Sequence, residues 1–253
     1  MFETSPVQKF AAVALGLVVC GGFGASAARA QAAPDYAALI AAPDRSDADR
    51  QADQRRNPVP LLTFAGVRPG MKVLDMGAGG GYSTELIARA VAPNGMVYGQ
   101  FPADGFAKAI EAFQARLKTP AMSDAAADFR PFDDPIPPDV HDLDLITFLF
   151  YYHDTTYMKV DRAAMDRKMF AALKPGGFLV LADHSAKTGA DISVGKSLHR
   201  IDEAVVRQEL GAAGFKLAAA GDFWRVPGDT RDFSSNRPPS PVDAFVLKFQ
   251  KPK

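Results

Sequence analysis

The sequence predicts a single doubly wound α/β domain, in which helices cover both faces of a mostly parallel sheet. Apolar strand candidates alternate with helical stretches along most of the chain, as expected of strand–helix–strand units. Residues 143–151 are apolar apart from Asp144 and Thr147, which is typical of a strand covered on both faces. A third observation is a glycine-rich turn at residues 77–81, placed between a strand candidate and a helix candidate.

The elements can be assigned in order along the chain. Strand candidates are residues 72–76, 95–100, 125–129, 143–151, 178–182, 215–223 and 242–249, of which 125–129 gives the weakest pattern. Within residues 37–56, rich in Ala, Asp and Arg, a helix can be capped by Asp44, Ser46 or Asp47. The further helix candidates are residues 83–92, 104–118, 156–173 and 201–213. Asn57-Pro58 is expected to stop the first helix and Lys174-Pro175-Gly176-Gly177 to end the fourth. Residues 225–241 are rich in Pro, Ser and Gly and predict a long loop.

Composition excludes several classes of function. The 253 residues carry 29 Lys plus Arg and 29 Asp plus Glu, a formal net charge of +0. This balance disfavours a partner that binds through charge alone, such as nucleic acid or an anionic membrane. The single cysteine, Cys20, can form neither an internal disulfide framework nor a multi-cysteine zinc site.

The first thirty residues predict a secretory signal peptide. Lys9 precedes an uncharged apolar stretch over residues 10–24, and Ala28-Arg29-Ala30 provides a small-x-small cleavage site. The apolar stretch is shorter than the roughly 18–20 residues that span a bilayer comfortably. We therefore expect cleavage after Ala30 and no stable membrane insertion afterwards.

Cleavage defines the expected organisation and location of the chain. Residues 1–30 would be the signal peptide, 31–66 an N-terminal helical extension and 67–253 the main domain. The protein is expected to be exported, to the periplasm; if the signal is not used, it is cytoplasmic. Cleavage also removes the only cysteine, which suits an oxidising compartment.

The glycine turn is the most informative segment. Val73-Leu-Asp-Met-Gly-Ala-Gly-Gly-Gly-Tyr82 passes from a strand into a helix, and glycine lets a ligand lie against bare backbone. A dinucleotide fingerprint Gly-x-Gly-x-x-Gly fails, because Tyr82 stands at its last position. Asp75 before a Gly-x-Gly-x-Gly pattern instead resembles motif I of the class I S-adenosylmethionine-dependent methyltransferases.

The resemblance extends over residues 67–215. Asp142-Leu-Asp144-Leu-Ile-Thr-Phe resembles the family's fourth-strand motif, and Leu173-Lys-Pro-Gly-Gly-Phe-Leu-Val-Leu the segment leading into strand five. The chain looks most similar to a group of bacterial predicted methyltransferases with signal-like N-termini. The resemblance implies a Rossmann-like sheet whose last strand is antiparallel, with S-adenosyl-L-methionine as cofactor and a small molecule as methyl acceptor.

The same resemblance implies the cofactor-binding residues. Asp75 would organise the amino acid end of the cofactor, and Asp128 resembles the residue that receives the adenine amino group. Gln100 stands where the family usually has an acidic residue for the ribose hydroxyls, so weaker binding is expected. The backbone of the turn itself would lie along the cofactor, through Gly77, Ala78, Gly79, Gly81 and Tyr82.

Three histidines are the candidate catalytic residues. His153 and His184 follow two neighbouring central strands, so both should emerge at the carboxyl edge of the sheet beside the glycine turn. His199 follows a long segment that can fold over the site. Histidine is a suitable proton acceptor near neutral pH. Capping a strand or bonding a loop is the alternative role for each, and the ligand spacing specifies no metal site.

Two other functions compete with small-molecule methylation. One is an exported binding or scaffold protein that keeps the fold without turnover; the signal peptide favours it, because the cofactor is made in the cytosol. An NAD-dependent oxidoreductase would share the sheet but needs the missing glycine and ribose acid. Nucleic-acid methylation is disfavoured, since Phe150-Tyr-Tyr-His-Asp replaces the expected Asn/Asp-Pro-Pro-aromatic segment. The sequence does not specify the methyl acceptor or the oligomeric state.

Overall fold

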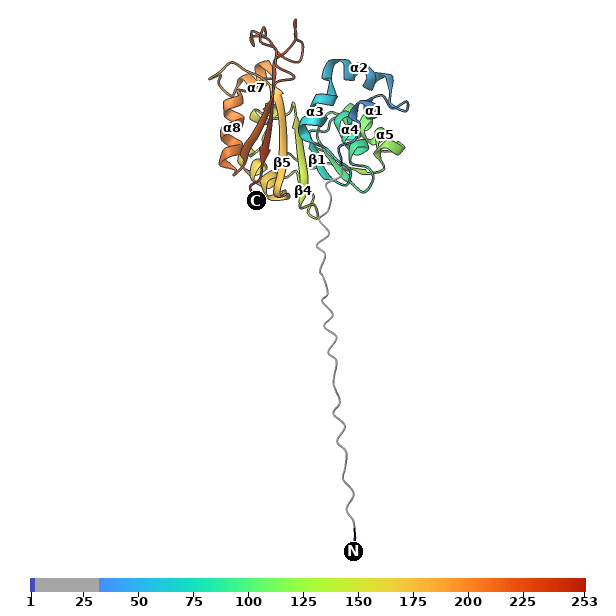
Figure 1. Ribbon diagram of the computed structural model, residues 1–253. Helices are drawn as coiled ribbons and strands as arrows, with labels where there is room; N and C mark the ends of the chain where they lie inside the picture. The colour runs from blue at the N-terminus through green and yellow to red at the C-terminus, as the bar shows by residue number, and fades with distance from the viewer. Residues whose placement is uncertain (3–31) are drawn as a thin grey trace. The chain divides into compact units, whose positions relative to one another are not determined.

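Seven strands form one sheet in the computed structural model, which describes residues 1–2 and 32–253 (Figure 1). The order across the sheet is β3-β2-β1-β4-β5-β7-β6. The strands are β1 (Lys72–Met76), β2 (Met96–Gln100), β3 (Ala125–Asp128), β4 (Leu143–Leu149), β5 (Leu173–His184), β6 (Lys216–Gly221) and β7 (Ala244–Gln250).

The pairing confirms the predicted doubly wound sheet. Strands β1 to β5 pair in parallel wherever they are neighbours, and β7 is antiparallel to both β5 and β6. The order reverses at β1, whose neighbours are β2 on one side and β4 on the other. A crevice at the carboxyl ends of the strands is expected at such a reversal point, and the glycine turn follows β1 there.

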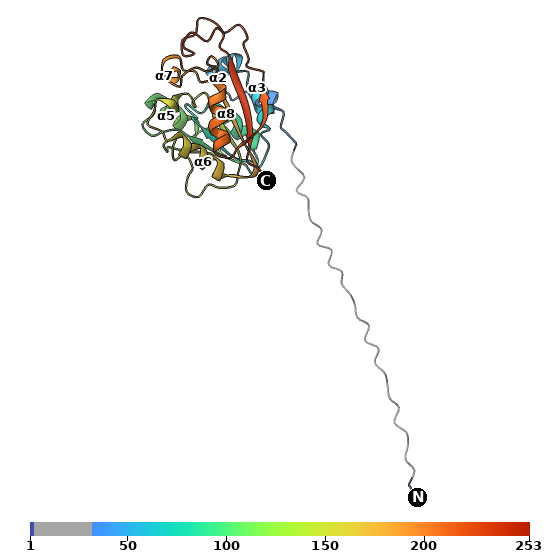
Figure 2. The same cartoon turned by 90° about the vertical axis from the view of Figure 1, so that its left-hand side faces the viewer.

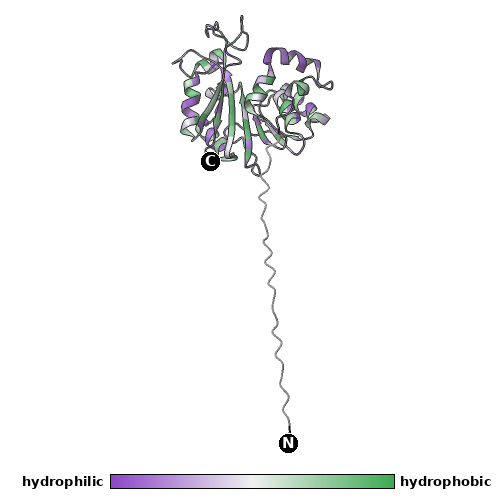
Figure 3. Cartoon of the chain, in the orientation of Figure 1, coloured by the Kyte–Doolittle hydropathy of each residue, from purple (hydrophilic) through white to green (hydrophobic). Residues whose placement is uncertain are grey.

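Helices cover both faces of the sheet. On one face, Leu62 of α3 (Pro58–Ala65) and Leu86 of α4 (Tyr82–Val91) pack in a buried cluster with the strands. On the other, Met169 of α6 (Arg162–Ala172) and Leu210 of α8 (Glu203–Ala212) do the same (Figure 2). The strands are largely apolar while α2 is strongly polar (Figure 3). The remaining helices are α1 (Tyr36–Ile40), α2 (Asp47–Arg56), α5 (Ala107–Arg116), α7 (Val194–Leu198) and the 3-10 turns η1 (Pro120–Met122) and η2 (Asp154–Thr156).

Several predicted element bounds are wrong. The helix predicted within 37–56 is α2, which Ser46 caps and which ends before Asn57-Pro58 as predicted. Helices α1 and α3 were not predicted, and Pro58 begins α3 because proline suits a first helical turn. Helix α6 starts at Arg162, not at 156, because the Asp161 side chain caps it by accepting from the Ala164 N–H. The Lys174–Gly177 segment belongs to β5, where the Gly176 N–H donates to the Lys251 carbonyl.

The predicted signal peptide over 1–30 and its cleavage after Ala30 fall on residues that the structure, apart from the first two, does not describe. Export and the division at residues 31–66 and 67–253 therefore stay predictions. Among the described helices, none is long and apolar enough to cross a membrane.

A chain of polar groups connects the buried Tyr152 to side chains of α6 and α8. The Tyr152 hydroxyl has two carboxylates within bonding distance, Asp166 at 3.0 Å and Glu209 at 2.7 Å, but it has only one proton to donate. Arg162 forms an ion pair with Glu209 at 2.7 Å. Burial raises the pKa of Asp166 to about 7, so a protonated Asp166 can donate to Tyr152, which in turn donates to Glu209.

This arrangement predicts that stability falls as the pH rises. In the folded protein Asp166 keeps its proton up to about pH 7, whereas in the unfolded chain it loses the proton near pH 4. The stabilisation that protonated Asp166 gives to the folded state is therefore complete below pH 4 and is lost as the pH rises to about 7. Asp166→Asn should flatten this dependence and raise the free energy of unfolding at pH 8 by about 1–3 kcal/mol. Urea unfolding at several pH values measures it. The exposed Asp139→Asn serves as control, and a lower stability of D166N at pH 8 would contradict the account.

Candidate active site

A cavity of about 720 Å³ opens where four strands end at their carboxyl edge. Its walls are formed by the glycine turn after β1, residues 101–106 after β2, residues 149–158 after β4, and His184 at the end of β5. Its size lies within the roughly 300–1,000 Å³ typical of small-molecule and cofactor pockets. This is the edge at which the sequence predicts ligand binding.

The glycine turn needs its glycines for two different reasons. Gly77 and Gly79 line the cavity with φ values of 66° and 54°, a backbone region that side chains strongly disfavour. A Cβ atom at Gly77 would lie 2.7 Å from the Tyr151 ring. Gly81, also predicted to contact the cofactor, does not line the cavity. Its φ is 82° and an added Cβ would collide with Phe113 at 2.5 Å, so it allows α4 to pack closely.

Asp75 does not line the cavity; it supports the glycine turn through buried hydrogen bonds. Its carboxylate is fully buried and accepts hydrogen bonds from three hydroxyls, Ser83 at 2.8 Å, Thr84 at 2.7 Å and Thr147 at 2.7 Å. Burial raises the pKa of Asp75, and the three hydroxyl donors oppose that rise. Because Ser83 and Thr147 do line the cavity, Asp75 orients polar groups toward a ligand.

Gln100, predicted to face the ribose, instead supports the glycine turn. Its side chain is completely buried, its Oε1 accepts from the Gly77 N–H at 3.2 Å, and its Nε2 donates to the Arg130 carbonyl at 2.6 Å. A carboxylate could accept the first bond but could not donate the second, which explains why an amide fits here. The exposed carboxylate that does line this side of the cavity is Asp104, which the sequence reasoning missed.

Asp128 ends β3 near the same side of the cavity, without lining it. Burial raises its pKa to about 6, and among the described residues its Oδ2 atom has no hydrogen-bond partner. A buried acceptor without a partner is costly and is usually satisfied by a ligand or water. Beside it, Phe101, Phe132 and Tyr151 form an aromatic cluster that offers stacking faces, with centroid distances of 5.9 and 6.1 Å to Tyr151.

Tyr82 and Ala78, the other two turn residues with a predicted cofactor role, line the cavity. The Tyr82 hydroxyl donates to Asp53 at 2.6 Å, and the Arg56 guanidinium lies 4.7 Å from the centre of its ring. Arg56 also lines the cavity, so its guanidinium can pair with a carboxylate of a bound ligand. Helix α2 supplies both Asp53 and Arg56 and so brings the N-terminal segment into the site.

The structure brings the three predicted histidines together at the far end of the cavity. His153 is buried between two carboxylates: its Nδ1 lies 2.7 Å from Asp183 and its Nε2 lies 3.2 Å from Asp154. Burial disfavours the charged ring, but Asp183 and Asp154 outweigh it and raise the pKa of His153 to about 10. His153 therefore serves as a fixed cation or hydrogen-bond donor at neutral pH, not as a free base.

His184 has the opposite electrostatics. Its ring stacks against Phe150 with centroids 4.7 Å apart, and its Nδ1 has no hydrogen-bond partner among the described residues. Burial lowers the pKa of His184 to about 4, so the ring is neutral at neutral pH. Its place in the cavity wall suits contact with a ligand better than proton transfer.

His199 is held against the other two by its loop. Its φ of 50° is unusual for a residue with a side chain, and such strain is often found at functional sites. The Ser235 hydroxyl donates to the His199 carbonyl at 2.7 Å, so the loop predicted over 225–241 is joined to the segment that ends at His199. A Cβ at Gly195 would lie 2.2 Å from Thr156, so only glycine lets α7 approach η2 this closely.

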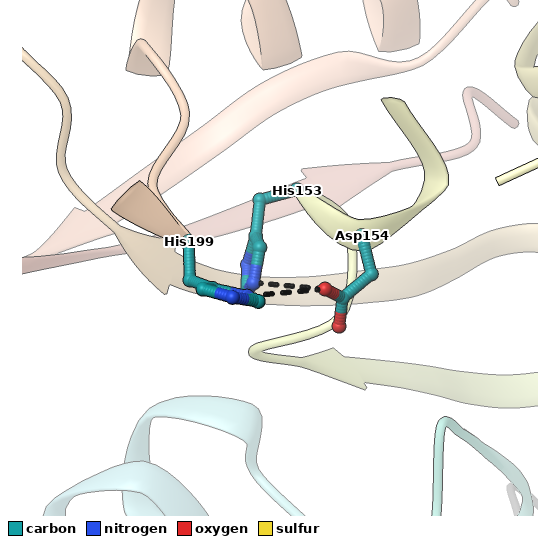
Figure 4. A group of neighbouring side chains, drawn as sticks. All are labelled: His153, Asp154 and His199. Atoms are coloured by element: carbon teal, nitrogen blue, oxygen red, sulfur yellow. Dashed lines mark ion pairs between the residues drawn. The ribbon is translucent and has the colours of Figure 1, made fainter. Parts of the chain in front are cut away.

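Sequence reasoning missed the carboxylate that joins these histidines. Asp154, next to His153, has its Oδ1 within 3.2 Å of His153 and 3.5 Å of His199, and it also accepts from the Tyr157 hydroxyl (Figure 4). The adjacency of Asp154 to His153 in the sequence was the one signal that could have identified this carboxylate.

Trp224 forms another wall of the cavity. Its indole N–H donates to the Arg56 carbonyl at 2.9 Å, and its ring packs against Phe150.

Comparison with known proteins agrees with this geometry. Residues 58–120 match the model of the protein-L-isoaspartate (D-aspartate) O-methyltransferase family, a segment that contains the glycine turn. A search of curated proteins finds no match to the sequence.

Solved methyltransferase structures share the fold. A S-adenosylmethionine-dependent methyltransferase from Aquifex aeolicus superposes with a TM-score of 0.57 at 17% identity, over 81% of this chain and 99% of that one. A putative sarcosine dimethylglycine methyltransferase from Galdieria sulphuraria gives 0.58 at 15%, over 82% and 91%. Fibrillarin from Aeropyrum pernix, solved with natively bound S-adenosyl-L-methionine, gives 0.52 at 12%, over 76% and 73%. The predicted fold is confirmed, and the family match supports the predicted enzyme class.

Proposed function

We propose that this protein is an S-adenosylmethionine-dependent methyltransferase that acts on a small-molecule acceptor. The observation that carries the proposal is the cavity itself, which joins the glycine turn at one end to a polar group of histidines at the other. The family match over residues 58–120 and the methyltransferase fold support the reaction class. The enclosed volume of about 720 Å³ favours a small acceptor over a polymer.

The residues at the turn end fit this cofactor. The bare backbone of Gly77 and Gly79 leaves room for its amino acid part, and Arg56 stands where it can pair with the carboxylate. Asp104 is the exposed acid placed to bond the ribose hydroxyls, in the role first predicted for Gln100. The Oδ2 of Asp128, which has no hydrogen-bond partner among residues 1–2 and 32–253, is the acceptor proposed for the adenine amino group.

The chemistry then depends mainly on positioning. Bound S-adenosylmethionine supplies a methyl group on a positively charged sulfur, and the acceptor's lone pair takes that methyl as the carbon–sulfur electrons return to sulfur. The protein has to hold the acceptor in line and take up the proton that an oxygen or nitrogen acceptor releases. His153 and His184 line the acceptor end of the cavity, together with the partly exposed pair of His199 and Asp154.

An assay of methyl transfer tests the proposal. The protein is incubated with S-adenosylmethionine carrying an isotopically labelled methyl group and with a bacterial extract separated into small-molecule and macromolecular fractions. We expect label to enter the small-molecule fraction together with formation of S-adenosylhomocysteine. Label confined to macromolecules would contradict the acceptor class. A protein that binds the cofactor but labels neither fraction would favour the exported scaffold.

A further inference from the structure

We propose that His153, Asp154 and His199 form a binding site for a divalent first-row transition-metal ion. The three side chains converge from two separate segments, since His153 and Asp154 follow β4 and His199 follows α7 (Figure 4). One ligand atom from each lies within 4.8 Å of the others. Two histidines and one carboxylate on one side of an ion are the set that such metals use when they keep open coordination positions.

The separations fit shared coordination. Ligand atoms bound to one ion at about 2.0–2.2 Å lie roughly 3.0–3.5 Å apart at octahedral or tetrahedral angles. Asp154 Oδ1 is 3.2 Å from His153 Nε2 and 3.5 Å from His199 Nδ1. The third separation, between one nitrogen of each histidine, is at most 4.8 Å. Movement of the partly exposed Asp154 and His199 side chains toward a common ion would close the shell, while His153 stays fixed.

The surroundings of His153 prepare it to be a ligand. Asp183 is fully buried and accepts three bonds, from His153 Nδ1, the His153 N–H and the His184 N–H. This holds the ring through Nδ1 and turns Nε2 toward Asp154. Binding of the ion would displace the Nε2 proton that His153 carries at neutral pH. A carboxylate behind a metal-bound histidine is the usual supporting arrangement in protein metal sites.

The backbone also holds the third ligand in place. His199 keeps a strained φ of 50°, and its carbonyl is fixed by Ser235. Gly195 permits the close contact between α7 and η2, and this contact brings His199 near His153. All three ligand residues line the cavity, so open positions on the ion would face it. A molecule with an oxygen or nitrogen donor could then complete the coordination shell.

Titration of untagged protein with Co²⁺, followed by the visible absorption of the bound ion, tests the site without any cofactor. We expect one Co²⁺ per chain, displaced by Zn²⁺, and binding weakened about tenfold or more by H199A and D154N. His141→Ala is the matched control, because His141 also lies beside a carboxylate, Asp142 at 2.9 Å, but is exposed away from the cavity. It should bind as the unaltered protein does.

Three results would overturn the proposal: no saturable Co²⁺ binding at millimolar concentration, binding unaffected by H199A, or equal weakening by H141A. If D154N does not fold, H199A alone decides, since His199 is partly exposed and its removal should leave circular dichroism unchanged. The metal test and the methyl-transfer assay use different ligands, so either proposal can fail while the other stands.

Discussion

Replacing Arg200 with methionine is expected to lower the free energy of unfolding by about 3–5 kcal/mol, because it leaves a buried carboxylate without its partner. Both side chains of the Arg200–Asp229 pair are fully buried, with a nitrogen–oxygen distance of 2.8 Å. Arg200 also donates to the carbonyls of Ser185 and Phe233 at 2.9 Å each. It therefore joins the end of β5 to the loop that leads to β7. Chemical denaturation measures the loss.

Arg207→Met provides the matched control for this prediction. Arg207 forms an ion pair with Glu203 one helical turn away, and both side chains are partly exposed. Such pairs contribute about 0–1 kcal/mol, so R207M should unfold close to the unaltered protein. Equal stabilities of R200M and R207M would show that the buried pair does not hold the loop.

Gly77→Ala is expected to weaken S-adenosylmethionine binding by roughly 10–100-fold while leaving the fold intact. The φ of 66° at Gly77 disfavours any side chain, and the added methyl would meet the Tyr151 ring at 2.7 Å. The glycine turn and the Tyr151 ring must then move apart, at the place where the backbone of the turn is proposed to contact the cofactor. Calorimetry measures the affinity, and circular dichroism checks the fold.

Gly189→Ala separates backbone strain from the effect on the site. Gly189 has a similar φ of 77°, yet an added Cβ would meet no atom within 4 Å and the residue lies outside the cavity. Its alanine variant should lose stability by about 1 kcal/mol and keep full affinity. If both variants bind the cofactor as the unaltered protein does, the glycine turn does not contact it.

The sheet could be predicted from sequence because local patterns determine it. The apolar run over 143–151 and the glycine turn after Asp75 are short-range signals that needed no knowledge of the partners. The start of α6 was predicted wrongly because a single capping side chain, that of Asp161, decides it. Such choices between neighbouring residues differ by only about 1 kcal/mol, which a pattern does not resolve.

The site was less predictable because its geometry comes from contacts between distant segments. Gln100 stands at the end of its strand as predicted. Its side chain turns away from the cavity because it donates to the Arg130 carbonyl, a hydrogen bond that the sequence does not reveal. Likewise, the meeting of His199 with Asp154 depends on Gly195 and Ser235. The chemistry-bearing residue types were recognisable; the partners that orient them were not.

Calorimetric titration of S-adenosylmethionine into the purified protein tests the central claim most directly. The account predicts saturable binding of one molecule per chain, with competition by S-adenosylhomocysteine, because both share the adenosine and amino acid parts that the cavity is proposed to hold. A folded protein that shows no binding heat with either compound at millimolar concentration, and no competition between them, would contradict the account.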